Sequence, residues 1–304
     1  MDKKILSQPL YKRRSLVACM EYSFKILRSN WLGIIKTAWI PLIIFAIGEA
    51  LVIVSGSSLN PNPVWSIIGF LVTLVGYLTF FGLFYHWMEN YKKNSEFIPL
   101  DFRHNIKASL RQLFRFLVVH IPAGILITIL LYISIYSFLS LVIPLPFSIP
   151  LWVGIVALVV LIYLCIPLTV FCINFLIGKQ PYFSSFIKGM ILGTRHWGAF
   201  FALGFMVMVL YGLFSILVSL PLEVSFIIEM MNRNSMAEGN SYALPAFFPI
   251  AKFILSCIVT FVVELASLYP LLSLILLYTS YEVQSKERAA YENQQKEADN
   301  LKKV

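Results

Sequence analysis

The chain has 304 residues, of which 59% are hydrophobic and only 13% are charged, whereas soluble domains carry roughly 25% charged residues. This composition excludes an ordinary soluble protein and indicates that most of the chain lies in a lipid bilayer. The net charge of +9 does not indicate nucleic-acid binding, because the basic residues lie beside the apolar stretches, where they set orientation. We therefore expect an all-α integral membrane protein that binds no nucleic acid.

Six apolar stretches are long enough to cross roughly 30 Å of hydrocarbon, for which a helix needs about 20 residues. In chain order they lie at about 33–54, 64–88, 115–143, 149–177, 197–222 and 250–281. The first starts too late and runs too long for a signal peptide, so we expect an uncleaved span. The sequence predicts one six-span membrane domain, residues 1–281, and a charged, helical cytoplasmic tail, residues 282–304.

The lysines and arginines predict the direction in which each span crosses the membrane. Of the 24 in the chain, 21 lie before the first span, in the connections 89–115 and 178–196, or after residue 281. The alternate connections contain one, Arg233. Because cytoplasmic segments are enriched in lysine and arginine, we expect both termini in the cytoplasm.

A short basic stretch precedes every second span. These stretches read SFKILRSNWLG at 23–33, NIKASLRQLFRF at 105–116 and SFIKGMILGTRHWG at 185–198. Lys25, Lys107 and Lys188 follow an apolar residue at the same place in each stretch, with spacings of 82 and 81 residues. Such stretches are typical of interfacial amphipathic helices, in which lysine contacts lipid headgroups.

The nearly constant spacing predicts an internal repeat. We expect three parallel units, about 15–95, 96–178 and 179–281, each an interfacial helix followed by a transmembrane hairpin. The alternative interpretation is that any protein built from membrane hairpins shows a basic stretch before an apolar one.

Two carboxylates lie inside predicted spans, where an ionisable group costs roughly 2.5–3.5 kcal/mol. Glu49 lies in the first span and Glu264 near the middle of the sixth. One hypothesis is that one or both face a cavity and bind a proton or a cationic group. The other is that each is a hydrogen-bonded carboxyl that joins two helices, with Ser267 or a tyrosine as its partner. Lys252, at the start of the sixth span, would form an ion pair with Glu49 if these two spans are neighbours.

Motifs for catalysis and for metal binding do not occur in the sequence. It contains no GxSxG, HExxH or GxxxxGK[ST] pattern, and these are the patterns that place a nucleophile, a zinc ion or a phosphate. The four cysteines form no CxxC, and the pair His86 and Glu89 would need further ligands to hold a metal. We therefore predict a protein that is not an enzyme, with no catalytic residue, metal or cofactor.

An amphipathic stretch precedes each hairpin, and Pro270, Tyr278 and Tyr281 lie in the last span and at its exit. This pattern resembles the membrane domain attached to some glycerophosphodiester phosphodiesterases. Related bacterial integral membrane proteins share this pattern, so the resemblance implies a bacterial inner membrane. It implies no phosphodiesterase activity, because a separate soluble barrel carries that chemistry and residues 282–304 are too few for one. Six spans with cytoplasmic ends also resemble the permease subunits of ABC exporters, which have one amphipathic helix where this chain has three.

From these observations we expect a non-enzymatic scaffold or lipid-associated accessory protein whose partners are membrane lipids. The tail 282–304 offers a surface for a protein partner, because Glu282 and Lys286 are spaced as an i, i+4 pair that favours a solvated helix. The alternative is a transport protein, either an exporter-like permease subunit or a carrier that uses Glu49 and Glu264.

Overall fold

The computed structural model describes residues 10–57, 63–94, 97–98, 106–140, 150–178, 180–237, 244–245 and 247–301. Their regular structure is helical throughout: α2 (Leu16–Ser57), α3 (Pro63–Asn94), α4 (Ile106–Leu139), α5 (Leu151–Gly178), α6 (Tyr182–Arg195), α7 (Trp197–Ala237) and α8 (Phe248–Leu301). Each of them except α6 is long and apolar enough to cross a membrane. The expected all-α fold with six helices of membrane-spanning length and composition is therefore confirmed.

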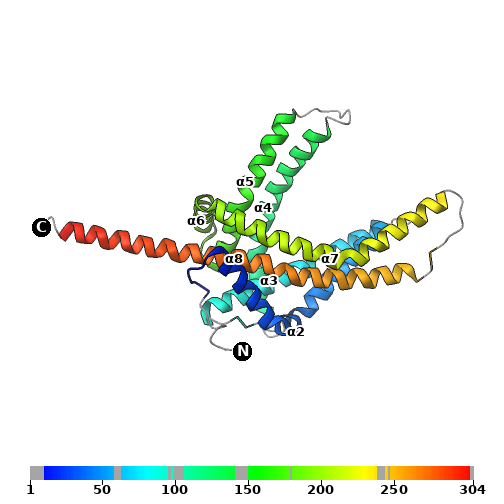
Figure 1. Ribbon diagram of the computed structural model, residues 1–304, viewed down its shortest axis with the longest axis horizontal. Coiled ribbons are helices and arrows are strands. Elements are labelled where there is room, and N and C mark those ends of the chain that lie inside the picture. Colours follow the sequence, from blue (N-terminus) through cyan, green and yellow to red (C-terminus); the bar gives the residue numbers. More distant parts are fainter. Residues whose placement is uncertain are drawn as a thin grey trace.

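The six long helices form three hairpins, α2–α3, α4–α5 and α7–α8 (Figure 1). The α4–α5 hairpin diverges from the other two, and α8 continues as a single helix well beyond the rest of the molecule. α8 also packs along α2, and α6 lies against α5. The three hairpins meet at one end, which we call the basic end because Arg14, Lys92, Arg115 and Arg195 lie there.

The apolar core lies at the basic end. Its largest fully buried side chains include Trp87 and Tyr91 of α3 and Phe171 of α5, and these pack with Leu272 and Leu276 of α8. Farther along the hairpins most apolar side chains of α4 and α7 are exposed, many by half or more. Such extensive apolar exposure is unstable in water and stable in lipid, in agreement with a multi-pass membrane protein.

Basic side chains fix the end of α5 within this core. The guanidinium of Arg115, from α4, donates a hydrogen bond to the carbonyl of Phe175. The ammonium of Lys92, from α3, donates to the carbonyl of Ile177 at 3.2 Å. These carbonyls belong to the last turn of α5, and the last four carbonyls of a helix have no partner within it. The two bonds therefore join α3 and α4 to α5.

Two glycines one turn apart, Gly189 and Gly193, hold α6 against α5. A Cβ atom on Gly189 would lie 2.4 Å from the Cα of Phe171, and one on Gly193 would lie 2.6 Å from the Cα of Pro167. The two backbones approach this closely because neither glycine has a side chain. This contact fixes α6 along α5 and with it the end of α6 at Arg195.

Several boundaries differ from the expected ones. The stretch 23–33 and the described part of the second stretch, residues 106–116, run without a break into the spans that follow them, within α2 and α4. Among the described residues the third stretch alone forms a separate helix, α6. α7 continues to Ala237, well past residue 222, so much of the connection expected between the fifth and sixth spans is helical. Pro221 lies inside α7 and does not end it. The threefold repeat stays a prediction.

Candidate functional site: a groove between α2, α7 and α8

An apolar groove of about 570 Å³ lies where α2, α7 and α8 come together. Trp31 of α2, Leu210 and Phe214 of α7 and Val262 of α8 line it. Trp31 is 53% exposed and Leu210 50% exposed, so the groove is open to the surroundings of the bundle. Its volume falls within the roughly 300–1,000 Å³ that is typical of sites for small organic ligands.

One charged side chain lines this groove, that of Arg28. Phe24, Arg28 and Trp31 are spaced by four and three residues, which places them on one face of α2. That face belongs to the stretch 23–33, in which the sequence singled out Lys25 instead. Lys25 lies beside Glu21, with 3.8 Å between the ammonium nitrogen and the carboxylate oxygen. The groove therefore has an apolar length and a single cationic end.

Both predicted intramembrane carboxylates lie in a second cavity, of about 300 Å³, which is lined by the same three helices as the groove. Glu49 from α2 and Glu264 from α8 line it, together with Ser215 of α7. Two helices that are far apart in the sequence, α2 and α8, thus place the two carboxylates at one site.

The Oε1 atom of Glu264 is buried and has no hydrogen-bond partner within the described part of the chain. The hydroxyl of Ser267, the partner considered from the sequence, donates to the main-chain carbonyl of Glu264 at 2.7 Å. A buried polar atom without a partner is costly, so this carboxyl oxygen is the feature of the cavity best suited to bind a proton or a small donor.

Lys252 forms an ion pair with Glu229 and not with the expected Glu49. Its ammonium lies 2.5 Å from the Oε2 atom of Glu229, near the end of α7, and 3.8 Å from the centre of the Phe226 ring. Arg233 reaches the other oxygen of the same carboxylate at 2.8 Å. The side chain of Lys252 is only 3% exposed, so this contact fastens α7 to α8 at the end of the hairpin far from the basic end.

The remaining residues singled out from the sequence lie outside the groove. Lys188 is exposed on α6, and the side chain of Lys107 lies outside the described residues. Glu89 accepts a hydrogen bond of 2.6 Å from the side-chain amide of Gln112 and lies 3.4 Å from Lys93, so it joins α3 to α4. In the described ranges no three His, Cys, Asp or Glu side chains lie close enough together to hold a metal ion.

Comparison with known proteins finds no match: no protein-family model fits the chain, and no curated protein or solved structure is similar to it. The two resemblances noted in the sequence therefore stay expectations. The groove and the carboxylate cavity are the features of the structure that indicate a function.

Proposed function

We propose that this chain is a non-enzymatic, lipid-associated membrane protein that retains one phospholipid in the groove between α2, α7 and α8. The observation that carries the proposal is the distribution of polarity along the groove. Its lining is apolar over most of its length, which suits an acyl chain, and Arg28 is its single charged residue. A guanidinium binds phosphate oxygens with two parallel hydrogen bonds, so Arg28 would hold the headgroup.

The proposal includes a location in a bacterial inner membrane with both termini in the cytoplasm. The concentration of lysine and arginine at the basic end supports this orientation. In a membrane crossed in this direction, Arg28 would lie near the cytoplasmic headgroups. Three parallel repeats of interfacial helix and hairpin would account for the lysines that recur at 25, 107 and 188. The part of α8 that extends past the bundle is then available to a protein partner.

Native mass spectrometry of the purified full-length protein tests the proposal. Leu210→Trp places a larger side chain in the groove from α7. Leu217→Trp is its matched control, because Leu217 lies two turns farther along α7, is 67% exposed and does not line the groove. We expect the wild type and L217W to retain one phospholipid through detergent washing and L210W to lose it. Arg28→Gln should reduce retention of anionic phospholipids and leave retention of neutral ones unchanged.

Equal retention of lipid by L210W and by the wild type would show that the groove does not hold it. A wild-type protein that carries no phospholipid after gentle washing would overturn the proposal as well. The melting temperatures of L210W and L217W are measured as well. Lipid retention is compared at a temperature at which both variants are folded, so that loss of lipid is not confused with loss of structure.

A second candidate function, a carrier for protons or small cations, is favoured by the presence of Glu49 and Glu264 in one cavity. If the chain is a carrier, proteoliposomes that contain it should dissipate an imposed pH gradient, and E264Q and E49Q should not. Glu223→Gln is the matched control, since Glu223 lies on α7, is exposed and does not line the cavity. Dissipation that is the same in all variants, or that is no faster than in empty liposomes, would exclude this candidate.

A further inference from the structure

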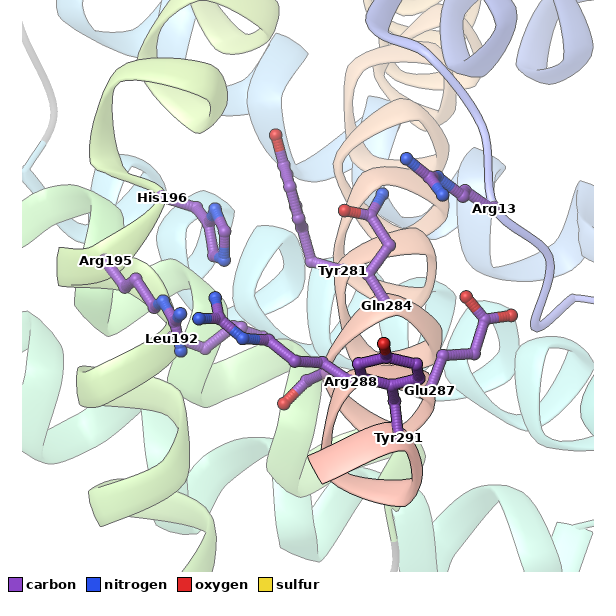
Figure 2. A pocket seen from close by; sticks show the side chains of 10 residues that line it. Arg13, Leu192, Arg195, His196, Tyr281, Gln284, Glu287, Arg288 and Tyr291 are labelled. Carbon is purple, nitrogen blue, oxygen red and sulfur yellow. The ribbon is translucent and has the colours of Figure 1, made fainter. Parts of the chain in front are cut away.

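A third cavity, of about 390 Å³, lies at the basic end, where α8 leaves the packed core (Figure 2). Three segments that are distant in the sequence line it. They are Arg13 ahead of α2, the junction of α6 and α7, and α8 from Tyr281 to Tyr291. The cavity therefore exists only when the chain is folded, and no single stretch of sequence indicates it.

The junction of α6 and α7 contributes Arg195, the last residue of α6, and His196. His196 is the C-cap residue of α6, and its backbone N–H donates to the carbonyl of Leu192 at 3.1 Å. The imidazole stacks on the ring of Tyr281, with 4.0 Å between the ring centroids. These two contacts and the close packing of α6 on α5 fix the direction in which Arg195 leaves the helix.

α8 contributes side chains from one face. Tyr281, Gln284, Arg288 and Tyr291 recur at spacings of three and four residues, so they lie one above another along the helix. Tyr281 is half-buried and contacts Phe200 of α7 with 5.8 Å between ring centroids, whereas Arg288 is exposed. This face therefore leads from the core into water, and hydroxyl, amide and guanidinium donors follow one another along it.

The cavity has an excess of positive charge, with three arginines against one carboxylate, Glu287. Figure 2 shows Arg195 and Arg288 reaching toward one another on one side of Tyr281, with Arg13 on the other side. Within the described residues no carboxylate forms an ion pair with Arg13 or Arg195.

Arg288 has a partner of its own on α8. Its Nε–H donates to Glu292 at 3.0 Å, which leaves the two terminal nitrogens of the guanidinium for another acceptor, since a guanidinium has five N–H donors. Two guanidinium groups that approach each other in this way repel, and an anion placed between them replaces the repulsion with two charge-assisted hydrogen bonds.

We infer that this cavity binds a phosphate group, held between Arg195 and Arg288. The phosphate belongs either to the headgroup of an anionic lipid or to a soluble phosphate compound, since the same donors suit both. The inference is independent of the lipid proposed for the groove between α2, α7 and α8, because Arg28 and the other residues of that groove do not line this cavity.

The test uses the full-length protein in nanodiscs and two probes. In the first arm, inorganic phosphate is titrated into protein held in phosphatidylcholine discs, and binding is measured by calorimetry at constant ionic strength. In the second arm, the melting temperature is measured in discs of phosphatidylcholine alone and in discs that also contain phosphatidic acid. Arg195→Gln and Arg288→Gln are compared with Lys286→Gln, a control that removes the same charge from a 69% exposed position on α8 outside the cavity.

We expect phosphate or phosphatidic acid to bind the wild type and K286Q equally, and R195Q and R288Q each to bind about tenfold more weakly, as the loss of one charge-assisted hydrogen bond predicts. Arginine-dependent binding in the first arm identifies a soluble phosphate compound, and arginine-dependent stabilisation in the second identifies a lipid headgroup. The inference is overturned if neither arm shows binding, or if K286Q weakens binding as much as the two arginine variants do.

Discussion

Replacing Gly189 with alanine should push α6 away from α5. The added Cβ would lie 2.4 Å from the Cα of Phe171, whereas ordinary contact begins at 3.4 Å. The neighbouring atom belongs to the backbone and cannot rotate aside, so the helices must separate by roughly 1 Å at this point. Overpacking of this kind costs about 1–3 kcal/mol, and the better helix propensity of alanine returns up to about 1 kcal/mol of it.

The net loss of about 1–2 kcal/mol should lower the melting temperature by a few degrees, measured by thermal unfolding of the purified protein in one detergent. Gly193→Ala should act in the same way, because its Cβ would lie 2.6 Å from the Cα of Pro167. Gly198→Ala is the matched control. It lies in the first turn of α7 with nothing within 4 Å of the added carbon, so this variant should melt at the wild-type temperature or slightly above it.

The same variants test whether the contact positions the basic cavity, because α6 ends at Arg195. G189A should weaken phosphate binding, whereas G198A should not. If G189A and G193A are as stable as G198A and bind phosphate as well, then α6 does not pack on α5 through these glycines, and the account of how Arg195 is positioned is wrong.

Two further predictions concern charged groups. Lys252→Met should destabilise the protein by about 1–3 kcal/mol, because the carboxylate of Glu229 loses its buried partner and keeps only the more exposed Arg233. Lys25→Met, at an exposed pair, should cost less than about 1 kcal/mol, and equal melting temperatures of the two variants would contradict this. Burial, and then the charge of Arg195, lowers the pKa of His196 from its ordinary value of 6.5, so the imidazole is neutral at pH 7 and gains a positive charge as the pH falls through the lowered pKa. Sulfate, whose charge is constant over this range, should therefore bind more tightly at lower pH in the wild type and not in His196→Gln, and a flat calorimetric profile in the wild type would refute the expectation.

The six long helices follow from the sequence because apolar length alone decides whether a segment can cross a bilayer. The ends of these helices cannot be predicted in the same way. The polar residues around Arg233 are typical of a loop, but in the structure they belong to α7, which continues to Ala237. The ion pairs that Glu229 makes with Arg233 and Lys252 supply the missing reason, because they give this polar turn partners on its own helix and on α8. Tertiary partners of this kind are not visible in local hydropathy.

The candidate sites show the same limit. The cost of burying charge was enough to single out Glu49 and Glu264, but the sequence could not show that they share a cavity, because that depends on α2 and α8 being neighbours. Arg28 was missed although its signal was present, a four- and three-residue spacing from Phe24 to Trp31 that places all three on one helical face. Such spacing becomes informative only when the helix packed against that face is known.

The three cavities have one element in common, which is α8. Residues 259–264 line the carboxylate cavity, residues 262–269 the apolar groove, and residues 281–291 the phosphate cavity proposed above. At 1.5 Å per residue, the first and the last of these lie on one continuous helix and are separated by roughly 25 Å or more. A shift of α8 along its axis would therefore change all three linings together. The α4–α5 hairpin lines none of them, but α5 contacts the elements that line the phosphate cavity. It packs on α6, it accepts a hydrogen bond from Tyr278 of α8 at Asn174, and it accepts one from Trp197 of α7 at the carbonyl of Tyr163.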